Sequence, residues 1–234
     1  MTAQLPRSPR RRLRRRAWRS APFASLDFET TGLDYLHDEV VSFGVVPIRA
    51  GRISVGASIH QLVEPMIPPS AASVVHGTSS QDPAGSPTAA DARGTLRVAL
   101  DGCFILSWYA PVEIVFLGRM FEGGRRRFRR RTIDVRELAI GIDRRRGHLS
   151  EAAEYSLSAC ASRYGVPVAS PHDALDDALV TAQVFLVLAL ASSARDSPAS
   201  AHCCTPGERD GSSKSSYCNA SSMSVVTQLW GQSR

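Results

Sequence analysis

"SLDFETTGL", residues 25–33, places two carboxylates, Asp27 and Glu29, in a segment that otherwise has the apolar character of a buried strand. Successive side chains on a strand point to opposite faces, so Asp27 and Glu29 share one face and Leu26 and Phe28 the other. Burying a carboxylate is costly unless it is paired or holds a metal. The pair is therefore either the polar face of an edge strand or half of a site.

The surroundings of this pair favour a metal site. Apolar residues precede it, and the Thr-Thr-Gly-Leu turn leaves both acids at the carboxyl end of the strand, where ligand sites lie in open α/β sheets. Two neighbouring carboxylates repel, and each raises the pKa of the other unless a cation lies between them. Oxygen ligands alone favour Mg²⁺ or Mn²⁺.

The composition indicates one globular domain with a basic surface. The chain has 234 residues, 43% of them hydrophobic, which is enough for a single core. Its formal net charge is +6, and all but Lys214 of its 28 basic residues are arginines. Arginine pairs bidentately with phosphate, so we expect a polyanionic partner such as nucleic acid.

The sequence indicates neither a membrane span nor an oxidising compartment. We find no run of about 18 apolar residues, the length that crosses a bilayer, and the longest candidate is 178–191. The cysteines show neither zinc-ligand spacing nor an even disulfide framework. They are Cys103, Cys160, Cys203, Cys204 and Cys218. We expect a soluble, cytoplasmic protein with no membrane partner.

Three regions differ in character. Residues 1–20 contain a nearly continuous arginine run and no acid, and we expect a basic disordered arm that either touches nucleic acid or is merely solvated. Residues 21–191 alternate apolar and polar positions as a folded domain does. Residues 192–234 are rich in Ser and Gly without periodicity, which predicts a disordered low-complexity tail.

The folded region predicts a mixed α/β sheet. Antiparallel strands come first, with a hairpin turn at Ala50-Gly51, and strands and helices alternate after them. Strands are expected at 22–29, 40–48, 52–63, 103–107 and 132–135. Helices are expected at 88–100, 112–121 and 149–167. A last helix is expected from Ser170 as N-cap, with Pro171 in its first turn.

Further acids occur in two comparable settings. Glu113 begins a helix directly after a buried strand, although a helix N-terminus favours acids without any catalytic reason. His172 stands beside Asp173, Asp176 and Asp177 near the start of the last helix, which is more than a helix start requires. Periodicity does not decide which aspartate faces a site.

Together these motifs resemble the DEDDh exonucleases, the family of the proofreading epsilon subunit of bacterial DNA polymerase III and of ribonuclease T. The resemblance spans roughly residues 22–190. LDFETTGLD (26–34) is similar to the first motif, and Glu113 occupies the place of the second. The closing pattern His-x-Ala-x-x-Asp matches His172, Ala174 and Asp177.

The resemblance implies a ribonuclease H-like mixed sheet with helices on both faces, and it makes 21–191 an exonuclease domain. It assigns Asp27, Glu29, Glu113 and Asp177 as ligands of two divalent ions, Mg²⁺ or Mn²⁺, and His172 as general base. Two ions about 3.5–4 Å apart stabilise the attacking and leaving oxygens of an in-line displacement. A histidine, with an ordinary pKa of about 6.5, can accept the proton of the attacking water.

The resemblance also suggests where nucleic acid binds. SVVHGTSSQD (73–82) is similar to the family's histidine-glycine turn, and TIDVRELA, from residue 132, is similar to its later short strand. The expected nucleic-acid contacts are Thr30, Thr31, Gly32, Leu33, His76 and Trp108. A DNA polymerase is a possible partner, as for the epsilon subunit.

The sequence departs from the family pattern at the second motif. Glu113 replaces the usual Asp, so the ligand is one methylene longer, and either the helix is set back or activity is reduced. Trp108 and Tyr109 replace a polar pair, and they either pack in the protein or stack on a base.

The run GGRRRFRRR (123–131) predicts a basic loop. Arg125, Arg126 and Arg127 could follow the phosphates of a single strand, with Phe128 as a stacking platform, or the loop could be merely solvated.

Three functions remain open on the sequence alone. The first is a metal-dependent 3′ to 5′ exonuclease acting on single-stranded DNA in proofreading or repair. The second keeps the mechanism but acts on RNA or short oligonucleotides. The third is a nucleic-acid- or polymerase-binding module with a weakened site, although a weakened site has no need of His172.

Overall fold

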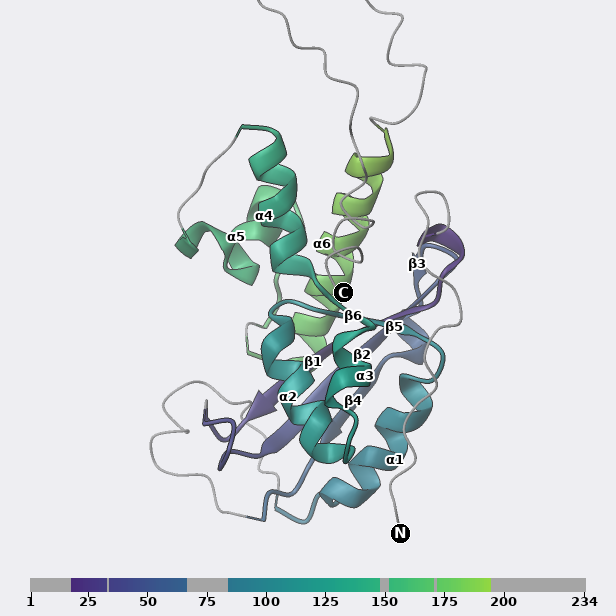
Figure 1. Cartoon of the computed structure of the whole chain (residues 1–234), viewed down its shortest axis with the longest axis vertical. Helices are drawn as coiled ribbons and strands as arrows, with labels where there is room; N and C mark the ends of the chain where they lie inside the picture. The colour runs from purple at the N-terminus through teal and green to yellow at the C-terminus, as the bar shows by residue number, and fades with distance from the viewer. Residues whose placement is uncertain (1–17, 33, 67–83, 148–151, 171, 195–234) are drawn as a thin grey trace, which may run out of the picture.

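Residues 25–30 of the SLDFETTGL segment lie in the central strand of a mixed sheet (Figure 1). The computed structural model describes residues 18–32, 34–66, 84–147, 152–170 and 172–194. Its strands are β1 (Phe23–Thr30), β2 (Val40–Arg49), β3 (Arg52–Ile53), β4 (Ile59–Leu62), β5 (Phe104–Ser107) and β6 (Thr132–Asp134). Its α-helices are α1 (Ala89–Ala99), α2 (Ala110–Met120), α3 (Arg125–Arg129), α4 (Val135–Arg145), α5 (Leu157–Arg163) and α6 (Ala174–Ala194).

The strand order is β3-β2-β1-β5-β6, and β4 also pairs with β2. β1 and β2 are antiparallel, as are β2 and its partners β3 and β4, whereas β1, β5 and β6 run parallel. This confirms the ribonuclease H-like mixed sheet. The expected strand 52–63 is divided into β3 and β4 by a 3-10 turn at Val55–Ala57, where the exposed Gly56 has no side chain to pack.

Helices cover both faces of the sheet, and each face has its own core (Figure 1). Phe23 of β1 packs with α4, α5 and α6, whereas Leu26 and Phe28 pack with α1, α2 and Phe128. By strand alternation, Asp27 and Glu29 point to the α6 face at the end where β1 runs out. The shared face predicted for the two acids is therefore confirmed.

The N-terminal boundary of the fold lies earlier than expected. Trp18–Ser20 form a 3-10 helix, and Trp18 is 6% exposed with its ring edge-on to Phe185 at 6.5 Å. Trp18, which the sequence assigned to the arm 1–20, therefore packs on the core, whereas Arg19 and Ser20 are exposed. Residues 1–17 and 195–234, which hold the rest of the predicted arm and nearly all of the predicted tail, lie outside the described residues.

The helix α4 was not predicted, and α3 was predicted as a loop. Asp134 ends β6 and accepts a hydrogen bond from Glu137 N at 2.8 Å, so the chain turns directly into α4. Phe128 of α3 is fully buried with its ring 5.5 Å from that of Phe121. The predicted stacking of a base on Phe128 is therefore wrong, because the ring anchors α3 to the core.

Two predicted helix starts need correction. The expected helix 149–167 is a 3-10 turn at Ala152–Tyr155 followed by α5, because Ser156 caps α5 by accepting from Ala159 N at 3.2 Å. α6 begins at Ala174 rather than at Ser170. Its cap is Asp173, whose Oδ1 accepts from the backbone N–H groups of Leu175 and Asp176 at 3.0 and 3.1 Å. Pro171 lies outside the described residues.

Among the described residues, one helix has the length and hydropathy of a membrane span. In α6 the stretch Ala174–Ser192 has a mean hydropathy of 1.8, which corrects the prediction that no such stretch exists. Half of this stretch is buried inside the protein, and α6 packs against β1, β2, α4 and α5. Its apolar character is that of a core helix lying on a sheet.

Candidate active site

β1 brings the first two carboxylates to the site. Asp27 and Glu29 are both partly buried, and Asp27 lies opposite Gly44 of β2. The pairing with β2 shifts register between Glu29 and Thr30, directly beside the acids. Such irregularities re-aim side chains and end strand pairing next to functional sites.

α2 brings Glu113, which is only 4% exposed. Its Oε2 is buried without a hydrogen-bond partner among the described residues. Burial first, and then the nearby Asp134 carboxylate, raises the pKa of Glu113 to about 8. A buried carboxylate oxygen without a donor has the environment of a cation ligand.

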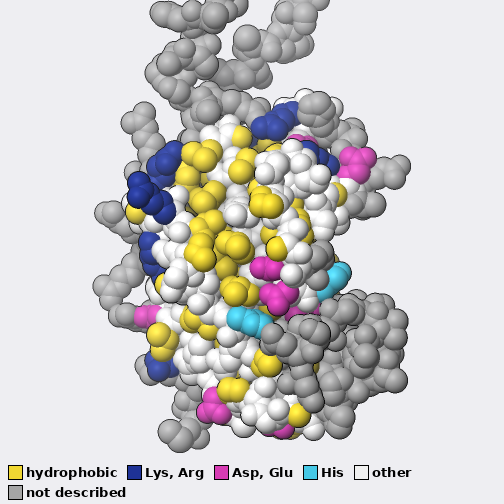
Figure 2. Space-filling model, turned by 180° about the vertical axis from the view of Figure 1, so that it is seen from behind, with side chains coloured by type: hydrophobic (Ala, Val, Ile, Leu, Met, Phe, Trp, Pro, Cys, Tyr) yellow, Lys and Arg dark blue, Asp and Glu magenta, His cyan; other side chains and the backbone are white. Residues whose placement is uncertain are grey.

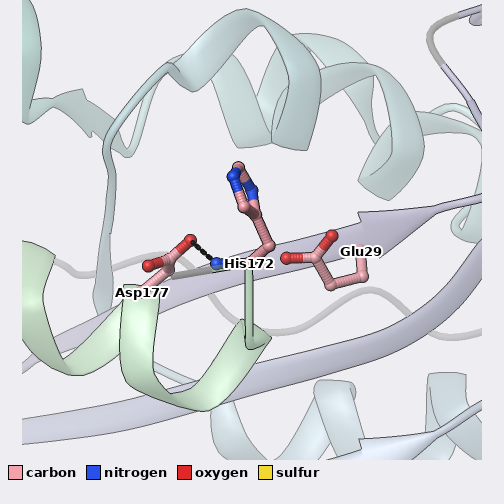
Figure 3. Close-up of side chains that lie close together, drawn as sticks. All are labelled: Glu29, His172 and Asp177. Carbon is pink, nitrogen blue, oxygen red and sulfur yellow. Dashed lines mark hydrogen bonds between the residues drawn. The ribbon is translucent and has the colours of Figure 1, made fainter. Parts of the chain in front are cut away.

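α6 brings Asp177, and the turn just before α6 brings His172 (Figure 3). The backbone N–H of His172 donates to Asp177 Oδ2 at 3.2 Å, and His172 has a φ of 66°. Ligand atoms of Glu29, His172 and Asp177 all lie within 4.8 Å of one another. The structure thus joins β1 and α6 at one point, and among the acids near His172 it selects Asp177. Asp173 caps the helix instead.

The four predicted carboxylates are coupled electrostatically, and burial and mutual repulsion raise their pKa values. Burial first, and then the charges of Glu113, Glu29 and Asp177, raises the pKa of Asp27 well above its ordinary value. Burial first, and then Asp177, raises the pKa of Glu29 to about 8. Burial also raises the pKa of Asp177, against the His172 N–H bond, which lowers it. A bound cation would relieve this repulsion.

Asp134 is a contributor that the sequence motifs did not indicate. Its Oδ2 accepts from Ala110 N at 2.9 Å, and its Oδ1 accepts from Glu137 N at 2.8 Å. One carboxylate therefore holds the N-termini of α2 and α4 together. Burial first raises its pKa to about 6, while these backbone donors lower it. Its position at the end of a short strand before an apolar helical stripe was the available signal.

The turn after β1 is held by its own side chains. Thr30 Oγ1 donates to Gly32 O at 2.7 Å, and Thr31 Oγ1 donates to Asp38 Oδ1 at 2.7 Å. A Cβ on Gly32 would lie 2.5 Å from Asp38 Oδ2, so a side chain at this position would require the Asp38 carboxylate to shift. The hydroxyls predicted to contact nucleic acid are thus engaged in shaping the turn. Leu33 and His76 lie outside the described residues.

The aromatic pair before α2 divides into a packed and an exposed ring. Trp108 is partly buried against the α6-side core, whereas Tyr109, the N-cap residue of α2, is 47% exposed. Tyr109 is therefore the more accessible of the two rings.

The predicted arginine contacts lie apart from the carboxylates. Arg125 and Arg126 are exposed on α3, and Arg127 is partly buried. Arg125 lies beside Gly118 in the last turns of α2, whereas Glu113 is in the first turn. The arginines and Glu113 therefore lie at opposite ends of α2.

Seen from the face opposite to that of Figure 1, acidic and histidine side chains gather at mid-height beside apolar surface (Figure 2). Arginine side chains lie toward the margins of the same view. The acidic side chains thus form a compact group on this face. Among the described residues in view, no basic side chains lie directly around that group.

Sequence comparisons relate this chain to known nucleases. The exonuclease family model named RNase T matches residues 25–185. A DNA polymerase III subunit epsilon-like protein of Rhodobacter capsulatus is 32% identical over 177 residues, which cover 74% of this chain and 24% of that protein. A PolC-type DNA polymerase III of Thermotoga petrophila is 30% identical over 73% of this chain and 12% of its own length. The chain thus spans only a small part of these relatives.

Structural comparison gives the same fold. The nuclease domain of 3′hExo, described as a DEDDh family member bound to rAMP, superposes with a TM-score of 0.59 at 14% identity. The match covers 74% of this chain and 94% of that domain. At this identity the likeness concerns the fold.

Proposed function

Because this chain belongs to the exonuclease family, whose family model spans residues 25–185, we propose that it removes nucleotides stepwise from the 3′ ends of single-stranded DNA. The observation that carries the proposal is the meeting of Glu29, His172 and Asp177 within 4.8 Å at the end of β1. Asp27 and Glu113 are proposed to belong to the same site, because the charge of Glu113 raises the pKa of Asp27.

We propose that Asp27, Glu29, Glu113 and Asp177 hold two divalent ions, Mg²⁺ or Mn²⁺. The donor set fits such ions, since it is all oxygen and includes the orphaned Glu113 Oε2. When bound, divalent ions lower the pKa of a coordinated water and offset charge on the oxygens of the phosphodiester.

His172 is the proposed general base, accepting the proton of the attacking water. It is exposed, as a group exchanging protons with solvent needs to be, and its backbone is fixed by the bond to Asp177. The exposed ring of Tyr109 is proposed to stack on a base of the strand, beside the predicted contact Trp108.

Arg125, Arg126 and Arg127 are proposed to bind phosphates of the strand away from the scissile end. Their place on α3, at the far end of α2 from Glu113, supports a role in affinity rather than in chemistry. Replacing the three with Gln is expected to flatten the salt dependence of single-strand affinity, by about 0.7 in slope for each phosphate that is no longer neutralised. An unchanged slope would exclude these arginines from the proposed interface.

Two properties of the relatives bear on the substrate and partner. The relatives from R. capsulatus and T. petrophila carry DNA polymerase III names, which favours DNA over RNA and a polymerase as a possible partner. Proofreading or repair is the setting that this substrate and polarity suit. A cytoplasmic location remains our expectation from the cysteine usage.

The deciding experiment follows 5′-labelled single-stranded DNA and RNA of one sequence with Mg²⁺, with Mn²⁺ and with a chelator. We expect metal-dependent laddering of DNA by the wild type and by Glu122→Gln, a matched neutralisation of an exposed acid. Asp27→Asn is expected to lose the ladder while retaining the wild-type circular dichroism. Faster cleavage of RNA would overturn the substrate, and a ladder shared with Asp27→Asn would overturn the enzyme.

A further inference from the structure

The first turn of α6 contacts β2 at Gly44. A Cβ built on Gly44 would lie 2.1 Å from Ala174 O and 2.5 Å from Leu175 Cα. Real Cβ contacts are never this short, and both atoms belong to the backbone, so no change of rotamer could relieve the overlap. The close approach of α6 to the sheet thus depends on the missing side chain.

This contact lies at the active site. Gly44 pairs with Asp27 across the β1–β2 ladder, and Ala174 lies between His172 and Asp177 in the chain. A side chain at position 44 would displace the start of α6, with His172 and Asp177, from β1, which carries Asp27 and Glu29. The rest of α6 is anchored independently, because Ala178, Ala182 and Phe185 are buried in the core.

We propose that Gly44 is a positioning residue, whose lack of a side chain seats the first turn of α6 against β2 and so sets His172 and Asp177 beside Glu29. The inference rests on the proposed exonuclease function and deepens it by naming what fixes the general base and one ligand relative to β1. Misplacing catalytic groups by about 1 Å costs roughly 100-fold in rate, so a single methyl group at this contact is expected to matter.

Two other glycines provide matched controls. Gly94 of α1 has nothing within 4 Å of a built Cβ, so Gly94→Ala adds a methyl group without a clash. Gly118 of α2 has its built Cβ 2.9 Å from Arg125 Cβ, so Gly118→Ala creates a clash between α2 and α3, away from His172 and Asp177. All three substitutions add one methyl group, at a strand position in Gly44 and at helix positions in Gly94 and Gly118.

The test measures kcat, KM, Mn²⁺ binding by calorimetry, and amide hydrogen exchange for Gly44→Ala, Gly94→Ala and Gly118→Ala. For Gly44→Ala we expect kcat to fall about 100-fold with KM changed less than about threefold, and Mn²⁺ affinity to fall about tenfold. Exchange should quicken at the Asp177 amide, which bonds to Asp173 O at 2.8 Å, while β2 stays protected. Gly94→Ala should match the wild type in kcat and in Mn²⁺ affinity.

Two outcomes would overturn the proposal. One is a Gly44→Ala protein with wild-type Mn²⁺ affinity and exchange at α6. The other is a Gly118→Ala protein with the same losses, which would make the effect a general loss of packing. If Gly44→Ala unfolds, the substitution is repeated in the Gly94→Ala background, because Ala stabilises a helix relative to Gly. Mn²⁺ affinity and hydrogen exchange test the role of Gly44 even if the wild type cleaves no substrate. Absence of cleavage by the wild type would therefore overturn the proposed exonuclease function without deciding the role of Gly44.

Discussion

The first turn of α2 and the first turn of α6 deliver side chains to the same end of β1, but they are built in opposite ways. Glu113 of α2 is 4% exposed with an unpartnered Oε2 among the described residues, and its helix is tied to the sheet by Asp134. His172, before α6, is exposed, takes a positive φ of 66° and is held by its N–H bond to Asp177.

The difference separates two kinds of cost. At α2 the cost is electrostatic, because a carboxylate is kept in a buried place beside other acids. At α6 the cost is conformational, because a non-glycine residue is kept in the left-handed region. A buried acid suits a group that holds a cation, and an exposed histidine suits a group that exchanges protons with water. The predictions below test this contrast, beginning with the largest effect.

Replacing His172 is expected to abolish most activity with little loss of stability. A general base contributes about 100- to 10,000-fold to rate, so His172→Ala and His172→Gly should both lose about that much kcat. Glycine adopts positive φ without strain, so His172→Gly should be more stable than His172→Ala by about 1 kcal/mol. Single-turnover kinetics and urea unfolding measure the two effects. Equal stability of the two variants would contradict the conformational cost.

Replacing Glu113 is expected to lower activity and to raise stability in the absence of metal. Glu113→Gln keeps the volume but removes a charge that repels Asp27, so kcat should fall by about 100- to 1,000-fold. In chelator at pH 8 the same variant should melt at a higher temperature than the wild type. Glu113→Asp, which restores the carboxylate of the usual family pattern, should retain more activity than Glu113→Gln. A lower melting temperature for Glu113→Gln would show that the buried charge is not destabilising.

Removing the Asp134 carboxylate, which links the N-termini of α2 and α4, is expected to have smaller effects on kcat and on stability. Asp134→Ala removes the acceptors of Ala110 N and Glu137 N, so stability should fall by about 1–2 kcal/mol and kcat by about tenfold. The control is Thr88→Ala, which removes the cap of α1, where Thr88 Oγ1 accepts from Asp91 N at 3.4 Å. It should lose similar stability and no kcat. If Thr88→Ala lost kcat as Asp134→Ala does, the loss of kcat would not be specific to the link between α2 and α4.

The last prediction concerns the pH dependence of stability without metal, which involves no substitution. Glu29 and Glu113 have pKa values of about 8 in the fold against an ordinary value of 4.5, so the folded protein binds more protons than the unfolded chain between these values. Their contribution is complete below pH 4.5 and is lost as pH rises toward 8, by at most about 1.4 kcal/mol per pH unit for each group. Melting in chelator from pH 5 to pH 8 should show this decline, and Mn²⁺ should reduce it. A melting temperature that rises with pH in chelator would contradict the repulsion.

The sequence was informative wherever a local pattern carries the chemistry. The alternation around Asp27 and Glu29 predicted their shared face, and the resemblance of His172, Ala174 and Asp177 to the family's closing pattern indicated the acid that the structure places beside Glu29. It was misleading for Phe128, because a ring within an arginine run has the local pattern of an exposed loop although its contacts with Phe121 come from the fold. It was also silent on α4, whose start depends on Asp134 ending a three-residue strand.

What the sequence by itself determined is the set of chemical groups and the elements that carry them: acids on a strand end, an acid at a helix start, and a histidine five residues before an aspartate. What only the tertiary structure decided is how closely they meet. The approach of α6 to β2 at Gly44 and the tie between α2 and β6 through Asp134 join residues distant in the chain. Local periodicity follows from steric preferences of neighbouring residues, whereas such contacts depend on how whole elements pack, which no short window of sequence contains.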